Sequence, residues 1–73
     1  MKEVSIKTEY IALGQMLKLA DCASSGGHAK ILLEEGVVQV NGEVEQRRGR
    51  KLYPGDKVQV RDCGSFVIAS QEA

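Results

Sequence analysis

Four cations fall within five residues of this chain, at Arg47, Arg48, Arg50 and Lys51. Guanidinium groups bind phosphate through two parallel hydrogen bonds, so a run of this kind could neutralise several phosphates of a polyanion. Gly49 lies within the run and permits the close approach of a backbone. A solvated run of charge is an equal alternative on composition alone, so the run needs support from other residues.

Support comes from a helix start that we predict near residue 25. The segment Ser25-Gly26-Gly27-His28 would offer free backbone N–H groups and the positive end of a helix dipole, which suit phosphate. Lys30 would lie one turn further along this helix, and Lys18 would lie on the polar face of a preceding helix. If the segment after residue 40 folds back beside the helices, these groups and the basic run form one cationic face.

The sequence lacks the residue arrangements that common catalytic mechanisms require. His28 is the only histidine, and we expect a surface imidazole without a partner rather than a catalytic base. Gly26-Gly27 lacks the following Lys-Ser/Thr of a nucleotide-binding loop. Paired carboxylates occur at a predicted helix end and beside a predicted turn, where solvated charge is expected (Glu34, Glu35, Glu43 and Glu45). The sequence therefore predicts a protein that is not an enzyme and has no metal or cofactor.

The two cysteines, Cys22 and Cys63, have no neighbouring Cys or His at the spacing of metal ligands. The N-terminus lacks the apolar core of a signal peptide, and no stretch approaches the ~18 apolar residues of a membrane span. We therefore expect a cytoplasmic chain with two reduced, partly buried thiols rather than a disulfide.

Aromatic residues make up only 4% of the chain. Tyr10, Tyr53 and Phe66 are scattered, and each is expected to be a core or turn residue. Because proteins that bind single strands stack bases on aromatic rings, this composition favours recognition of the backbone and shape of a folded RNA.

The length of 73 residues predicts one small domain over 1–73, with a flexible tail at 70–73. The formal net charge is zero, but the charge is segregated along the chain. Residues 47–61 carry a net +5, residues 1–46 a net −3 and residues 62–73 a net −2. A neutral protein with this pattern can present one cationic face to a polyanionic partner.

Two helices are predicted in the first half of the chain. Alternation over residues 3–7 predicts a short edge strand before them. Apolar residues at helical spacing predict a first helix that begins at about Thr8 or Ala12 and ends at Ala20. Ser25 is expected to cap a second helix, and Gly36 to end it.

The second half predicts strands. Asn41-Gly42 is typical of a two-residue hairpin turn, and Tyr53-Pro54-Gly55-Asp56 of a tight turn. Alternating apolar residues predict short strands at 38–40, 58–60 and 66–68. The order of elements predicts an α+β domain in which two packed helices lie against a small, twisted, mainly antiparallel sheet.

Four segments of the chain together resemble the S4 (S-four) RNA-binding domain, whose helix pair and hairpin are called the αL motif: residues 13–19, 25–30, 36–43 and 53–58. The similarity covers about residues 8–61 and is strongest to short stand-alone bacterial members of the YbcJ type. The resemblance implies RNA binding by a face built from Lys18, Ser25, His28, Lys30, Arg47, Arg48, Arg50 and Lys51. Many members carry an arginine where this chain has Ala12 and Gly26. Without these two arginines, RNA binding is expected to depend more on residues 47–51.

The leading hypothesis is a monomeric, non-catalytic protein that docks on structured RNA, either ribosomal RNA or tRNA, through phosphate contacts. A protein-interaction adaptor in a ribosome-assembly or RNA-processing complex, acting through acidic residues 34, 35, 43 and 45, is the alternative. An RNA chaperone without a defined target stays open. A ubiquitin-like sulfur carrier is not expected, because such proteins end in Gly-Gly and this sequence ends in Gln71-Glu72-Ala73.

Overall fold

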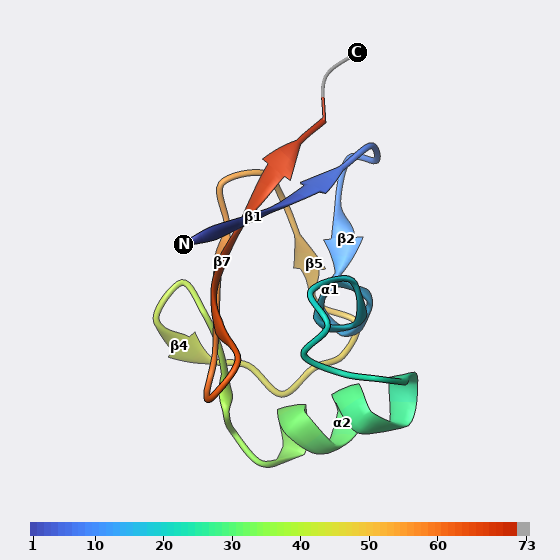
Figure 1. Ribbon diagram of the computed structural model, residues 1–73, viewed down its shortest axis with the longest axis vertical. Helices are drawn as coiled ribbons and strands as arrows, with labels where there is room; N and C mark the ends of the chain where they lie inside the picture. Colours follow the sequence, from blue (N-terminus) through green and yellow to red (C-terminus); the bar gives the residue numbers. More distant parts are fainter. Residues whose placement is uncertain (72–73) are drawn as a thin grey trace.

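Two short helices lie beside a five-stranded sheet and a two-stranded ladder in the computed structural model, which describes residues 1–71 (Figure 1). The predicted α+β class is confirmed. The elements in chain order are β1 (Lys2–Ile6), β2 (Ile11–Ala12), α1 (Leu13–Leu19), α2 (Gly26–Glu34), β3 (Val38–Val40), β4 (Glu43–Val44), β5 (Lys51–Leu52), β6 (Lys57–Val60) and β7 (Gly64–Ser70).

The five-stranded sheet has the order β1-β7-β6-β3-β4. Only β1 and β7 pair in parallel, and β1 lies at one edge, as the alternation over residues 3–7 predicts. The hairpin between β3 and β4 turns at Asn41 and Gly42, whose φ angles of 52° and 88° are those of a two-residue turn. This predicted hairpin is confirmed.

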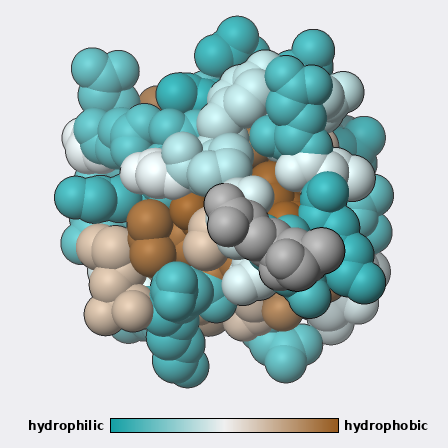
Figure 2. Space-filling view, turned by 90° about the horizontal axis from the view of Figure 1, so that it is seen from above, coloured by the Kyte–Doolittle hydropathy of each residue, from teal (hydrophilic) through white to brown (hydrophobic). Residues whose placement is uncertain are grey.

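The core lies between the helices and one face of the sheet. Apolar residues at every second position of β3, β6 and β7 meet the apolar stripes of α1 and α2. The buried residues include Leu13, Met16, Leu17, Ala29, Leu33, Val38, Val40, Val58, Val60, Phe66 and Ile68. The view from above in Figure 2 shows hydrophobic residues in the middle of the visible surface, with hydrophilic side chains around them.

The first helix begins close to the later of the two predicted starts, with Ala12 at its N-cap position and Ala20 at its C-cap position. Ile11 and Ala12 are extended and pair with β5, so α1 begins at Leu13 and the predicted start at Thr8 is wrong. The Thr8 hydroxyl instead donates a 2.7 Å hydrogen bond to the carbonyl of Tyr10. Neither helix within residues 1–71 is long and apolar enough to cross a membrane.

The second helix follows the prediction at both ends. Ser25 Oγ accepts a 3.1 Å hydrogen bond from the backbone N–H of His28, which satisfies one of the free donors of the first turn of α2. Gly36 has a φ of 73°, the left-handed conformation that ends a helix at little cost for glycine.

The last strand is longer than the predicted 66–68. β7 reaches Ser70, and the backbone N–H of Gln71 donates a 2.8 Å hydrogen bond to the carbonyl of Ile6. The sequence predicts a flexible tail over 70–73. Of this segment, Ser70 is the last residue of β7 and Gln71 makes the hydrogen bond to Ile6. Residues 72 and 73 lie outside the described residues.

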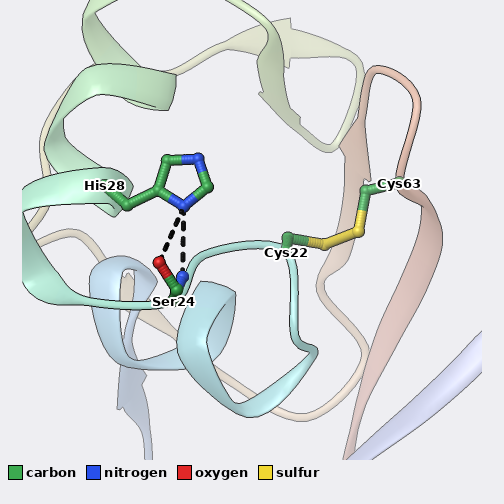
Figure 3. The surroundings of a disulfide bond; sticks show 4 residues. All are labelled: Cys22, Ser24, His28 and Cys63. Atoms are coloured by element: carbon green, nitrogen blue, oxygen red, sulfur yellow. Dashed lines mark hydrogen bonds between the residues drawn. A yellow bond between two sulfur atoms is a disulfide. The ribbon is translucent and has the colours of Figure 1, made fainter.

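The two cysteines form a disulfide (Figure 3). Cys22 lies in the connection from α1 to α2, Cys63 lies in the turn between β6 and β7, and their Cα atoms are 5.8 Å apart. The expectation of two reduced thiols is therefore wrong. Packing of the helix pair on the sheet brings these two connections together, and the separation of 41 residues along the chain gives no sign of it.

Candidate nucleic-acid interface

The segment 47–51, here called the basic loop, is attached to the start of α1. The backbone N–H groups of Leu13 and Gly14 donate hydrogen bonds of 2.8 and 2.9 Å to the carbonyls of Arg50 and Arg48. Ala12, at the N-cap position, provides no side-chain cap. The carbonyls of the basic loop therefore satisfy two donors that the first turn of a helix leaves free, and this fixes the loop against α1.

Gly14 is the point of closest approach between α1 and the basic loop. A Cβ atom at this position would collide with Cγ of Arg48 and would lie 3.2 Å from its Cδ. The sequence alone shows only that a glycine weakens the start of α1. The structure gives the reason for it, because the side chain of Arg48 crosses the helix where a methyl group would be.

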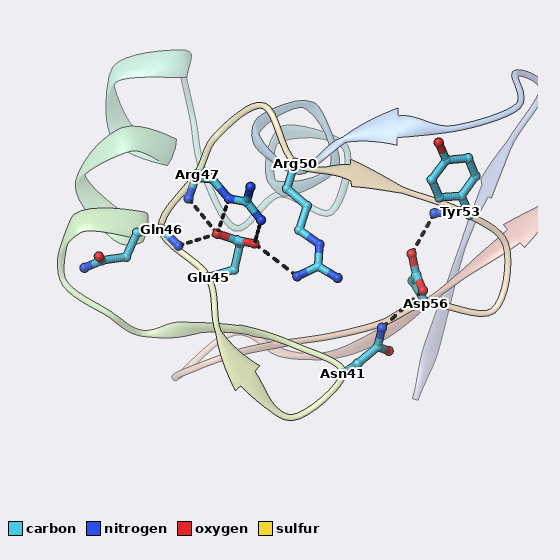
Figure 4. A network of polar contacts seen from close by, with 7 residues as sticks. All are labelled: Asn41, Glu45, Gln46, Arg47, Arg50, Tyr53 and Asp56. Atoms are coloured by element: carbon cyan, nitrogen blue, oxygen red, sulfur yellow. Dashed lines mark hydrogen bonds and ion pairs between the residues drawn. The ribbon is translucent and has the colours of Figure 1, made fainter.

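Glu45 organises the rest of the loop (Figure 4). Its Oε2 accepts hydrogen bonds of 3.0 Å from the backbone N–H groups of Gln46 and Arg47, and one of 3.1 Å from Nε of Arg47. Its Oε1 accepts bonds of 3.0 Å from Nη2 of Arg47 and Nη1 of Arg50. Glu45 is only 7% exposed, so the expected solvated carboxylate is wrong at this position.

The hydrogen bond from the Arg47 side chain contributes most to a low pKa of the Glu45 carboxyl, followed by the bond from the Arg47 backbone. Burial opposes them, but the pKa still falls from its ordinary 4.5 to about 2. Glu45 is consequently ionised at neutral pH and offsets part of the charge of Arg47 and Arg50. The four cations of the run are therefore not equivalent.

Arg48 and Lys51, in contrast, form no ion pair within residues 1–71, and both are exposed. Arg48 and Gly49 line a surface pocket of about 300 Å³ together with Lys18 of α1 and Gly26 of α2. Ala12, Gly14 and Gln15 complete its lining. The fold thus brings the basic loop, the polar face of α1 and the start of α2 to one place, as the sequence analysis expects for a cationic face.

The remaining candidates on α2 do not line this pocket. The Ser25 hydroxyl is engaged as the helix cap, and the Lys30 ammonium lies 3.9 Å from the carboxylate of Glu34 on the same exposed helix face. His28 Nδ1 accepts a 3.1 Å hydrogen bond from the backbone N–H of Ser24 (Figure 3), so the expectation of an imidazole without a partner is wrong.

One of the four acidic residues that the adaptor alternative would use is not free at the surface. Glu34, Glu35 and Glu43 are exposed, whereas Glu45 is buried under two arginines. Within residues 1–71, no group of three or more His, Cys, Asp or Glu side chains could hold a metal ion.

The structure brings together an aromatic pair next to the basic loop that the sequence did not predict. The rings of Tyr10 and Tyr53 lie 5.9 Å apart, and Nζ of Lys51 lies 4.9 Å from the centre of the Tyr10 ring. The prediction of a core or turn residue is confirmed for the buried Phe66 and for Tyr53, which begins the turn at 53–56, but the predicted scatter is wrong for the two tyrosines. The pairing of β2 with β5 brings the tyrosines together, and two strands of two residues each leave too weak a pattern to find in the sequence.

Residues 4–69 match the S4 domain, so the chain belongs to the S4 domain family and the resemblance found in its motifs is confirmed. It is 55% identical over 67 residues to a Bacillus subtilis (strain 168) protein named "Probable ribosome maturation protein RlbA", covering 92% of this chain and 94% of that protein. It is also 40% identical over 63 residues to an Escherichia coli (strain K12) protein named "Putative RNA-binding protein YbcJ", covering 86% of this chain and 90% of that protein. These relatives are small proteins of similar length.

Proposed function

We propose that this chain is a non-catalytic RNA-binding protein that docks on structured RNA through the phosphate groups of the backbone. Its contact surface consists of the basic loop, Lys18 and the start of α2. Family membership and the name of the Escherichia coli relative support the RNA-binding role. The name of the Bacillus subtilis relative favours ribosomal RNA over tRNA as the partner, and either RNA would place the chain in the cytoplasm.

The single observation that carries the proposal is the shared pocket of Lys18, Gly26, Arg48 and Gly49. Cations from two segments that lie far apart in the sequence converge there beside a tight backbone junction. A shallow surface of this kind suits the phosphates of a folded RNA, because arginine and lysine neutralise phosphate without reading a sequence. Since Glu45 holds Arg47 and Arg50, we assign the leading phosphate contacts to Lys18, Arg48 and Lys51.

A salt titration tests this assignment. Each phosphate that is neutralised adds about 0.7–0.9 to the slope of log affinity against log salt, so three leading contacts predict a slope of about −2 to −3. Binding of fluorescently labelled ribosomal RNA fragments and of tRNA would be followed by anisotropy from about 50 to about 400 mM salt. The triple variant Lys18→Ala, Arg48→Ala, Lys51→Ala should bind at least about tenfold more weakly and flatten the slope.

The matched control removes three cations from the five-stranded sheet and the turn after β6, as Lys2→Ala, Lys57→Ala, Arg61→Ala. Its net charge equals that of the triple variant, but its affinity should stay close to that of the unaltered protein. Equal losses in both variants would show that only net charge matters and would contradict the proposed surface. Salt-independent binding, or none, would contradict the RNA-binding function itself.

Crosslinking in the native cell, followed by sequencing of the attached RNA, would identify the partner. Enrichment of one ribosomal RNA region that is lost in the triple variant is the expected result. Recovery of proteins that survives nuclease treatment, without enrichment of RNA, would favour the adaptor alternative instead.

A further inference from the structure

Tyr10 and Tyr53 form an exposed aromatic pair at one end of the β2–β5 ladder. Ile11 pairs with Leu52, so Tyr10, which precedes β2, and Tyr53, which follows β5, come opposite each other. Their ring centres are 5.9 Å apart with the planes tilted by 50°, within the range of favourable aromatic pairs. The two residues remain 41% and 43% exposed, so each ring offers apolar surface to the solvent.

Both rings project from backbone that is held by hydrogen bonds. The Tyr10 carbonyl accepts the Thr8 hydroxyl at 2.7 Å. The Tyr53 N–H donates to Oδ2 of Asp56 at 2.8 Å, and the Asp56 N–H donates back to the Tyr53 carbonyl at 2.9 Å. Figure 4 shows the Tyr53 ring pointing away from the carboxylate of Asp56. A binding partner would therefore meet a surface that is already ordered, which lowers the entropic cost of binding.

The aromatic pair is continuous with the cations of the basic loop. Lys51 is the last residue of the loop and the first of β5, and its ammonium lies 4.9 Å from the centre of the Tyr10 ring. Lys51 and Tyr53 are two positions apart in extended backbone, which corresponds to about 7 Å. Aromatic rings interleaved with cations in this way are the arrangement that binds unpaired nucleotides, with bases on the rings and phosphates on the cations.

We infer that the Tyr10–Tyr53 pair stacks an unpaired nucleobase, such as one in a loop or bulge, of an RNA whose phosphates lie on the basic loop. This inference rests on the proposed function and extends it from backbone contacts to a base contact. Bases in a continuous duplex are hidden from such a surface, whereas splayed bases in loops and bulges expose their faces. The pair therefore gives the chain a preference for RNA with unpaired nucleotides, without a strong preference for sequence.

The chain contains no tryptophan and only two tyrosines, so its intrinsic fluorescence reports on this pair alone. Titration with a single-stranded oligoadenylate should quench the tyrosine emission as bases stack on the rings. Inorganic polyphosphate, which carries charge without bases, and a blunt RNA duplex should bind without comparable quenching. Free tyrosinamide in the same solutions corrects for absorption by adenine. Equal quenching by polyphosphate and oligoadenylate would overturn the inference.

Substitutions of the two tyrosines provide a second test of the inference. Tyr10→Leu and Tyr53→Leu keep apolar bulk and remove the ring, and each should weaken oligoadenylate binding about tenfold at fixed salt. Tyr10→Phe and Tyr53→Phe keep the ring and should bind like the unaltered protein. Duplex affinity and the salt slope should stay unchanged in all four variants, and circular dichroism would verify that they fold.

The two proposals fail in different ways. If the leucine variants bind oligoadenylate normally while the triple cation variant loses structured RNA, base stacking is wrong and phosphate docking stands. If no RNA binds in a salt-dependent manner, the proposed function is wrong. If the leucine variants change only the self-association of the protein, the tyrosine pair is a protein contact and the inference is overturned.

Discussion

At the residue scale, one carboxylate decides how the basic loop presents its charge. Glu45 accepts hydrogen bonds from two arginine side chains and two backbone N–H groups, and it is almost completely buried. Arg47 and Arg50 are therefore held by Glu45, whereas Arg48 and Lys51 form no ion pair within residues 1–71. A count of positive residues in this segment therefore overestimates the positive charge that is not already paired with Glu45.

Replacement of Glu45 tests this division of roles. Glu45→Gln should lower the free energy of unfolding by about 1–2 kcal/mol, because bonds to an ionised acceptor are replaced by weaker neutral ones. Urea unfolding measures the loss. RNA affinity should not fall, since the substitution releases two guanidinium groups. A variant of unchanged stability and weaker RNA binding would show that Glu45 belongs to the contact surface.

The low pKa of Glu45 also predicts how stability depends on pH. The folded-state pKa of about 2 lies below the ordinary value of 4.5, so the unfolded state takes up the proton first as the pH falls. The contribution of Glu45 is fully present above about pH 4.5 and is lost progressively as the pH falls towards about 2. The difference in unfolding free energy between the unaltered protein and Glu45→Gln should therefore shrink between about pH 6 and about pH 3. A difference that grows over this range would contradict the assignment.

At the scale of elements, the junction between α1 and the basic loop positions the pocket. Two backbone hydrogen bonds join them, and Gly14 lets the side chain of Arg48 cross the helix. The predicted cationic face thus depends on a contact between segments more than 30 residues apart, with a glycine at its centre.

Gly14→Ala should destabilise the protein by about 1–3 kcal/mol, although alanine favours helix by about 1 kcal/mol over glycine. The new methyl group would meet Arg48 Cγ, so either the side chain or the loop must move, and RNA affinity should fall with it. Thermal unfolding and RNA anisotropy provide the two readouts.

The collision can be isolated by a double-mutant cycle. In an Arg48→Ala background the nearest remaining contact of the new methyl group is the carbonyl of residue 48, at an ordinary 3.5 Å. Gly14→Ala should then be neutral or stabilising. A destabilisation of equal size in both backgrounds would assign the effect to the helix start rather than to Arg48.

At the scale of the whole molecule, a disulfide joins the helical part to the sheet. Cys22 and Cys63 are separated by 41 positions along the chain, and the segment between them contains α2, the β3–β4 hairpin and the basic loop. A crosslink over a segment of this length limits the unfolded chain more than it alters the native one. It therefore adds to the stability of a chain too short to bury a large core.

Reduction should lower the free energy of unfolding by about 2–4 kcal/mol and leave the fold intact. Urea unfolding with and without dithiothreitol measures the change, and Cys22→Ser, Cys63→Ser provides a variant that should not respond to the reductant. Ellman's reagent should find no reactive thiol in the unreduced native protein. Two reactive thiols before reduction would show that the bond does not form in solution.

The sequence by itself determined the elements whose signals are local. Ser25, Gly36, Asn41-Gly42 and the turn at 53–56 specify backbone conformation through their own chemistry, so the second helix, the hairpin and the turn were predicted correctly. Alternating valines predicted β3 and β6, since a period of two needs no knowledge of the partner strand. The ordered set of these motifs was also sufficient to find the family.

Only the tertiary structure decided which side chains meet. Four contacts join residues through packing or a two-residue ladder: the ion pairs of Glu45, the contact of Arg48 with Gly14, the Cys22–Cys63 bond and the tyrosine pair. Local conformational preferences act over a few residues, whereas these contacts depend on how the helices pack on the sheet. The composition of a basic surface is therefore readable from the sequence, but the charges that remain free on it are set by the folded neighbours of each cation.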